Sequence, residues 1–154
     1  MRTAVAAIIC FVIASPLIAA YAAGDLTRQK PIEVVVELGT KDGEMRFVPD
    51  QLEFETGKLY KLVLVNPSPH KHYFTSPTLA SKVFTRKVDV RYDGKRIAEI
   101  RGNIAEIEVF PGGQSEWWFV PVSTGTFSDL HCHVKEDGGP SHQDMGMVGT
   151  IRIR

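Results

Sequence analysis

The chain has 154 residues, of which 18 are basic and 18 acidic, and 44% of its residues are hydrophobic. This length suits one domain with a substantial core, and the composition is that of an ordinary globular protein. The balanced charge excludes the strongly basic surface that nucleic acid or an anionic membrane would attract, so we expect neither as a partner.

The beginning of the chain is typical of a secretory signal peptide. Arg2 precedes an apolar run that ends in small residues, a pattern that predicts cleavage after Ala22 or Ala23. An uncleaved membrane anchor is the alternative, although a Ser-Pro pair interrupts the run. We expect residues 1–23 to be removed and residues 24–154 to form a single domain that is periplasmic or secreted and free of the membrane.

Cleavage would leave one cysteine in the mature chain. Loss of residues 1–22 removes Cys10 and one arginine, leaving 17 basic against 18 acidic groups. In an oxidising compartment a lone thiol cannot form an internal disulfide. Metal ligation or burial as a small apolar residue would each explain Cys132.

The rest of the chain is predicted to consist mostly of short strands. Ser76 can cap one short helix over residues 76–84, where Pro77 suits the first position, and Asp93-Gly94 is a hairpin turn signal. This pattern favours an all-β fold, a β-sandwich with one short helix, and a small barrel is the competing architecture. The segments with strand-like β-branching or alternation are 31–38, 59–66, 103–110, 115–122 and 149–154.

Residues 130–149 concentrate side chains that bind metals: three of the five histidines, Cys132 and two methionines. This segment begins at the end of an expected strand, where side chains alternate between faces. Cys132 then points inward with Leu130, whereas His131 and His133 point outward. We therefore expect Cys132 to be a buried ligand and its two neighbours not to bind the same ion.

Other potential ligands lie near further strand ends. His142 and Met147 follow Cys132, and His70 and His72 lie upstream. A thiolate, imidazoles and a thioether suit copper, which must be bound as both Cu(I) and Cu(II). Zinc has no particular use for a thioether, and metals that prefer oxygen ligands do not fit this set. The pattern predicts one copper ion per chain.

These features resemble those of the cupredoxins, the type 1 or blue copper proteins. The resemblance implies a Greek-key β-sandwich with copper beneath the loops at one end, and the transfer of single electrons between redox partner proteins without enzymatic activity. It implies His72, Cys132 and His142 as ligands, with Met147 as the weak axial ligand. The matching motifs are "LVNPSPHKHYF", Cys132 followed by "HQDMGM", and the terminal "MVGTIRI".

Two ligand choices depend on position. We favour His72 over His70 because an aromatic residue follows His72 two positions later, as in the family. We favour Met147 over Met145 because Met147 directly precedes the last strand. Nine residues separate Cys132 from the second imidazole, a longer spacing than in the compact electron carriers of the family, and this leaves the site geometry and reduction potential open.

Two other functions stay open at this point. Residues 142–147 could hold Cu(I) and hand it on, as in a copper carrier or buffer for copper homeostasis or resistance. The sequence around Cys132 also resembles the His-Cys-His signature of multicopper oxidases. A trinuclear cluster with a type 1 site takes ten imidazoles in that family, whereas this chain has five histidines. The identity of the redox partners and the oligomeric state are not predicted by the sequence.

Overall fold

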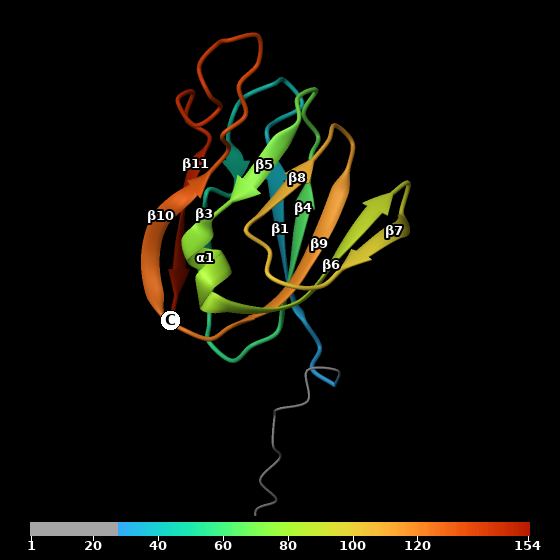
Figure 1. Cartoon of the computed structure of the whole chain (residues 1–154), viewed down its shortest axis with the longest axis vertical. Coiled ribbons are helices and arrows are strands. Elements are labelled where there is room, and N and C mark those ends of the chain that lie inside the picture. Colours follow the sequence, from blue (N-terminus) through green and yellow to red (C-terminus); the bar gives the residue numbers. More distant parts are fainter. Residues whose placement is uncertain (1–27) are drawn as a thin grey trace, which may run out of the picture.

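The computed structural model describes residues 28–154, which form two β-sheets packed face to face, with one short helix in this part of the chain (Figure 1). The predicted signal peptide, residues 1–23, lies outside the described residues. Sheet A has the order β2-β1-β4-β9-β6-β7 and contains β1 Ile32–Leu38, β2 Phe47–Val48, β4 Tyr60–Val65, β6 Val83–Tyr92, β7 Lys95–Ile100 and β9 Gln114–Pro121. Sheet B has the order β3-β11-β10-β5-β8 and contains β3 Gln51–Phe54, β5 His72–Thr75, β8 Glu106–Val109, β10 Gly125–His131 and β11 Val148–Ile153.

The core fills the space between the sheets. Inward residues such as Leu62 of β4 are fully buried, and aromatic side chains pack edge to face. The ring of Phe54 lies 4.9 Å from that of Tyr60 and 5.2 Å from that of Phe119. Such packing anchors both sheets to one hydrophobic centre. The predicted all-β sandwich with one short helix is confirmed, and the strands form two sheets rather than a small barrel.

The expected strand segments all contain strands, and the expected hairpin turn joins β6 to β7 through Asp93-Gly94. The helix is shorter than predicted, since α1 spans Pro77–Lys82 and the chain continues as β6 from Val83. β-branched Val83 adopts an extended conformation, which ends the helix. Within the described residues, no helix has the length and apolar character needed to cross a membrane.

A cluster of polar groups attaches α1 to sheet B. Ser76 caps the helix by accepting a hydrogen bond from the Leu79 N–H at 3.3 Å. The Asp129 carboxylate of β10 accepts hydrogen bonds from the Ser76 hydroxyl and the Thr78 N–H, both at 2.8 Å. Each polar group at this helix start therefore has a partner.

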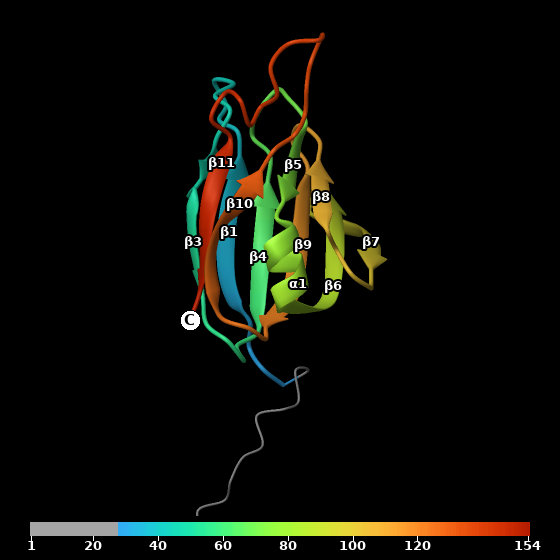
Figure 2. The same ribbon diagram turned by 60° about the vertical axis from the view of Figure 1, so that its left-hand side comes forward.

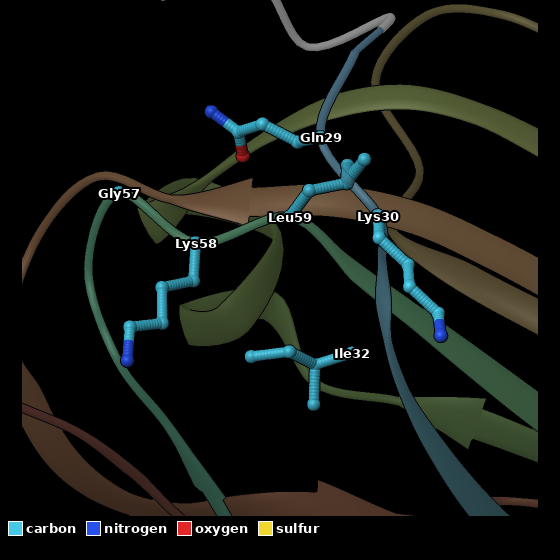
Figure 3. Close-up of a pocket in the computed structure, with 6 residues that line it drawn as sticks. All are labelled: Gln29, Lys30, Ile32, Gly57, Lys58 and Leu59. Atoms are coloured by element: carbon cyan, nitrogen blue, oxygen red, sulfur yellow. The ribbon is translucent and has the colours of Figure 1, made fainter. Parts of the chain in front are cut away.

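The two ends of the sandwich differ. At one end, the long segment between β10 and β11 rises beyond the sheets, beside the connection from β4 to β5 (Figures 1 and 2). The other end holds an open pocket of about 350 Å³ lined by Gln29, Lys30, Ile32, Gly57, Lys58 and Leu59 (Figure 3). This lining contains no histidine, cysteine or methionine, so the pocket is separate from the predicted metal ligands.

Candidate metal centre

Three of the four predicted ligands converge at the long-loop end of the sandwich. His72 is the first residue of β5, Cys132 directly follows β10, and His142 lies in the segment that leads to β11. One ligand atom from each lies within 4.8 Å of the others, and all three side chains are fully buried. The cluster contains His72 and not His70, in agreement with the position favoured from the sequence.

The three ligand atoms form a compact triangle. The Nδ1 atoms of His72 and His142 are 3.0 Å apart, and the Cys132 Sγ lies 3.5 Å from the His142 Nδ1 and 3.9 Å from the His72 Nδ1. A single ion with trigonal bonds of about 2.0–2.3 Å would hold its ligand atoms about 3.5–3.7 Å apart. Small adjustments would bring this nitrogen, nitrogen and sulfur set around one copper ion.

Met147 is linked to two residues of this triangle by main-chain hydrogen bonds. It is fully buried and directly precedes β11. Its N–H donates to the His142 carbonyl at 2.9 Å, and its own carbonyl accepts the Cys132 N–H at 3.2 Å. The three residues are thus joined by main-chain hydrogen bonds, and a ligand role for the Met147 sulfur remains a prediction.

The connection from β4 to β5 holds the His72 imidazole in place. The Ser68 hydroxyl lies 3.0 Å from the His72 Nε2 and orients the ring so that Nδ1 faces the cysteine. The Asn66 amide fixes this connection by donating to the carbonyls of His70 and Val109 at 2.7 and 2.8 Å. Partners on the second ring nitrogen are typical of metal-binding histidines.

Gly39 provides the space for this arrangement. It adopts a φ of +72°, and a Cβ there would approach the His72 Nε2 to 2.5 Å and the Ser68 Cβ to 2.7 Å. Side chains other than glycine would therefore clash and also adopt an unfavourable backbone conformation. The sequence reasoning missed Asn66, Ser68 and Gly39, although the "NPSPH" motif contains the first two.

The sulfur lies in a buried environment with one donor directed at it. The Tyr73 N–H donates to the Cys132 Sγ at 3.3 Å. Burial raises the pKa of the Cys132 thiol, with backbone N–H groups of Tyr73 and Val134 acting in the opposite direction. Without a metal the thiol is therefore protonated at neutral pH, and a cation would be needed to stabilise the thiolate.

The imidazoles are neutral for a related reason. Burial, with smaller contributions from His142 and His70, lowers the pKa of His72 to about 4. Burial also lowers the pKa of His142. Neutral imidazoles keep the lone pairs that a metal requires. The donor set and its protonation therefore fit copper, which Cys132, His72 and His142 would hold.

The long loop covers this cluster. The His70 ring packs edge to face against the His142 ring at 6.2 Å, and the His70 Nδ1 lies 2.8 Å from the Glu136 Oε2. The His142 Nε2 is buried and has no hydrogen-bond partner among residues 28–154. His70 is therefore outside the triangle, and it lies against its edge. The sequence contained no local signal for the approach of Glu136.

His131 and His133 lie outside the cluster, as the strand alternation predicted. His131 is half-buried and His133 exposed, whereas Leu130 and Cys132 are fully buried. The His133 ring stacks against Tyr73 at 4.4 Å on the outer face of sheet B. Met145 has 47% of its surface exposed, whereas Met147, the methionine predicted as the axial ligand, is fully buried.

Several solved structures resemble the chain over most of the described residues. A multicopper oxidase from Campylobacter jejuni is 18% identical, with a TM-score of 0.54 over 81% of this chain and 30% of that one. A copper nitrite reductase from Nitrosomonas europaea is 10% identical, with a TM-score of 0.53 over 86% of this chain and 52% of that one. An auracyanin from Roseiflexus castenholzii is 15% identical, with a TM-score of 0.49 over 79% of this chain and 96% of that one.

The likenesses to the oxidase and the nitrite reductase show the fold and no activity. The chain spans about a third of the length of the oxidase and about half of that of the nitrite reductase. No family model matches the sequence, and no curated protein sequence matches it. The chain has the cupredoxin fold. Its buried cluster of His72, Cys132 and His142, with Met147 beside it, resembles a type 1 copper site.

Proposed function

We propose that this chain is an exported cupredoxin that binds one copper ion and transfers single electrons between redox partner proteins. His72, Cys132 and His142 would be the strong ligands, and Met147 the weak axial ligand. The observation that carries this proposal is the buried triangle of two Nδ1 atoms and one sulfur. Bound copper would supply the one-electron change between Cu(I) and Cu(II).

The surrounding residues suit this use because they fix the ligands without the metal. Ser68 orients His72, and the Tyr73 N–H holds the sulfur. Main-chain hydrogen bonds join Cys132, His142 and Met147. A ligand set held by the sandwich changes little between two oxidation states, and the donor to the sulfur and the dry surroundings tune the potential.

Redox cycling with metal retention tests the electron-carrier function. The copper-loaded protein is reduced by a small mediator, reoxidised, and passed over a desalting column with a modest copper chelator present. We expect one copper per chain before and after several cycles. Loss of most copper to the chelator would contradict an electron carrier and support a copper carrier.

The carrier alternative has one supporting observation. Met145 lies within residues 142–147, has 47% of its surface exposed, and shares this segment with His142 of the cluster. Met145→Leu separates the two functions. If the protein is an electron carrier, Met145→Leu should retain copper as well as wild type does. If it is a copper carrier that captures Cu(I) through the Met145 thioether, the variant should bind Cu(I) more weakly than wild type.

We also propose that the chain is not an oxidase. A trinuclear cluster requires many imidazoles, whereas His131 and His133 lie on the outer face of sheet B, and the described residues contain one group of three potential metal ligands. Three or more copper ions per chain with oxygen consumption would contradict this proposal. We further propose that the protein is periplasmic or secreted and that its partners are redox proteins. Fractionation of expressing cells tests the location.

A further inference from the structure

We propose that His70 and Glu136 form a cover over the metal centre that controls the access of solutes to Cys132 and His142. The His70 ring lies against the His142 ring at 6.2 Å, and the Glu136 carboxylate holds His70 through a 2.8 Å contact to Nδ1. This cover pair joins two loops that are 66 positions apart in the sequence.

The burial of His142 shows what the cover does. This side chain is fully buried although it lies in a loop, and its Nε2 has no hydrogen-bond partner among the described residues. A polar atom in a surface loop normally reaches water or a partner. The His142 Nδ1 faces His72 and Cys132, and the His70 ring lies edge to face against the His142 ring.

Hydrogen bonds hold the His70 half of the cover in position. The backbone of His70 is fixed by the Asn66 amide on its carbonyl at 2.7 Å and by the Ser68 hydroxyl on its N–H at 3.0 Å. Ser68 also contacts His72, so the cover and a predicted ligand share one support.

The Glu136 half of the cover accounts for the long spacing between Cys132 and His142. Lys135 and Ser141 pair as an isolated β-bridge, and the Gly139 N–H donates to the Glu136 carbonyl at 2.8 Å in the turn. The extra residues thus form a small hairpin that presents Glu136 to His70. The side chains of His70 and Glu136 are 33% and 41% exposed, so their contact can open without disturbing the core.

The first test uses the metal-free protein and the rate at which iodoacetamide alkylates Cys132. The reagent reacts with the Cys132 thiolate when the cover opens, and besides burial the Glu136 charge also raises the pKa of this thiol. Each rate is therefore divided by the thiolate fraction of that variant, taken from the pH dependence of its alkylation, and the corrected rate follows the open population. Loss of this partially exposed hydrogen bond should raise that population about threefold to tenfold. We expect this increase for Glu136→Gln and a larger one for His70→Ala.

Two variants control for other causes. Asp137→Asn removes one carboxylate charge from the same hairpin and should leave the rate within about twofold of wild type. Asp129→Asn weakens the fold away from the cover, so equal acceleration in this variant would mean that the reagent enters through global unfolding. That result, or unchanged rates in both cover variants, would overturn the proposal.

The second test concerns copper and rests on the proposed function. The copper-loaded Glu136→Gln protein should release Cu(I) to an excess chelator about threefold to tenfold faster, with the position of its visible band unchanged. A shifted band with an unchanged release rate would overturn the cover in favour of a positioning role. If no copper binds, the alkylation test still decides whether the cover exists.

Discussion

Two polar clusters lie within a few residues of each other at the end of β10, and they differ in how their groups are satisfied. Asp129 accepts hydrogen bonds from Ser76 and Thr78 at the start of α1, and every group there has a partner. Around Cys132, the triangle brings buried nitrogen and sulfur atoms together, and the His142 Nε2 has no hydrogen-bond partner among the described residues.

This difference separates a structural cluster from a candidate binding site. Buried polar groups normally have hydrogen-bond partners, because an unpaired one costs about 1–3 kcal/mol. The Asp129 cluster meets this rule and attaches the helix to sheet B. In the triangle, two imidazole nitrogens and a sulfur have mainly one another as hydrogen-bond partners, and the His142 Nε2 has no partner among the described residues. That unpartnered nitrogen is costly for the metal-free protein, and a cation bound between the three ligand atoms would stabilise their close approach. The following predictions test this contrast.

Copper should stabilise the fold strongly through the triangle. A ligand present at 1,000 times its dissociation constant, and bound by the folded state, adds about 4 kcal/mol to the free energy of unfolding. We expect this gain in chemical denaturation of wild type and of Asp129→Asn, and its loss in His142→Ala. An equal gain in His142→Ala would place the binding elsewhere.

Gly39→Ala should damage the metal-free site itself. The new Cβ would meet the His72 Nε2 at 2.5 Å, and the φ of +72° is unfavourable for alanine. Strain and overpacking together should lower the free energy of unfolding by about 3 kcal/mol. Gly57→Ala is the matched control, because its φ is +77° but nothing lies within 4 Å of the Cβ. Similar losses in both variants would show that the His72 contact contributes nothing.

Asp129→Asn should cost about 1 kcal/mol at neutral pH, the usual value of a helix-capping interaction. Burial raises the pKa of the Asp129 carboxyl, but hydrogen bonds from Thr78 and Ser76 outweigh it and hold the pKa below its usual value. The carboxylate therefore stabilises the fold above the unfolded pKa of about 3.9, and this contribution disappears as pH falls through the lower folded pKa.

Denaturation at pH 7 and at progressively lower pH checks the sign. The difference between wild type and Asp129→Asn should shrink below about pH 4. A difference that grows on acidification would contradict the assigned hydrogen bonds.

The contrast also shows what the sequence could predict. The inward position of Cys132 and the outward positions of His131 and His133 follow from the alternation of side chains in a strand. Ser76 as a helix cap is equally local. By contrast, the contacts of His72 with His142 and of His70 with Glu136 span 70 and 66 positions and depend on how two loops meet. No local pattern encodes such a meeting, so the cover was not anticipated.

The helix end illustrates a smaller limit. Residues 83 and 84 continue the apolar pattern of the helix, yet they begin β6 because Val83 pairs with Pro121 of β9. Pairing in the sheet overrides a weak local preference. The element and its cap were predictable, whereas its last residues depended on a distant strand.

The visible absorption spectrum after addition of Cu(II) tests the central claim most directly. We predict an intense thiolate-to-copper band at one copper per chain in wild type, its loss in Cys132→Ser, and its retention in Asp129→Asn. A colourless wild-type protein, or an equally intense band in Cys132→Ser, would contradict a type 1 copper site built from His72, Cys132, His142 and Met147.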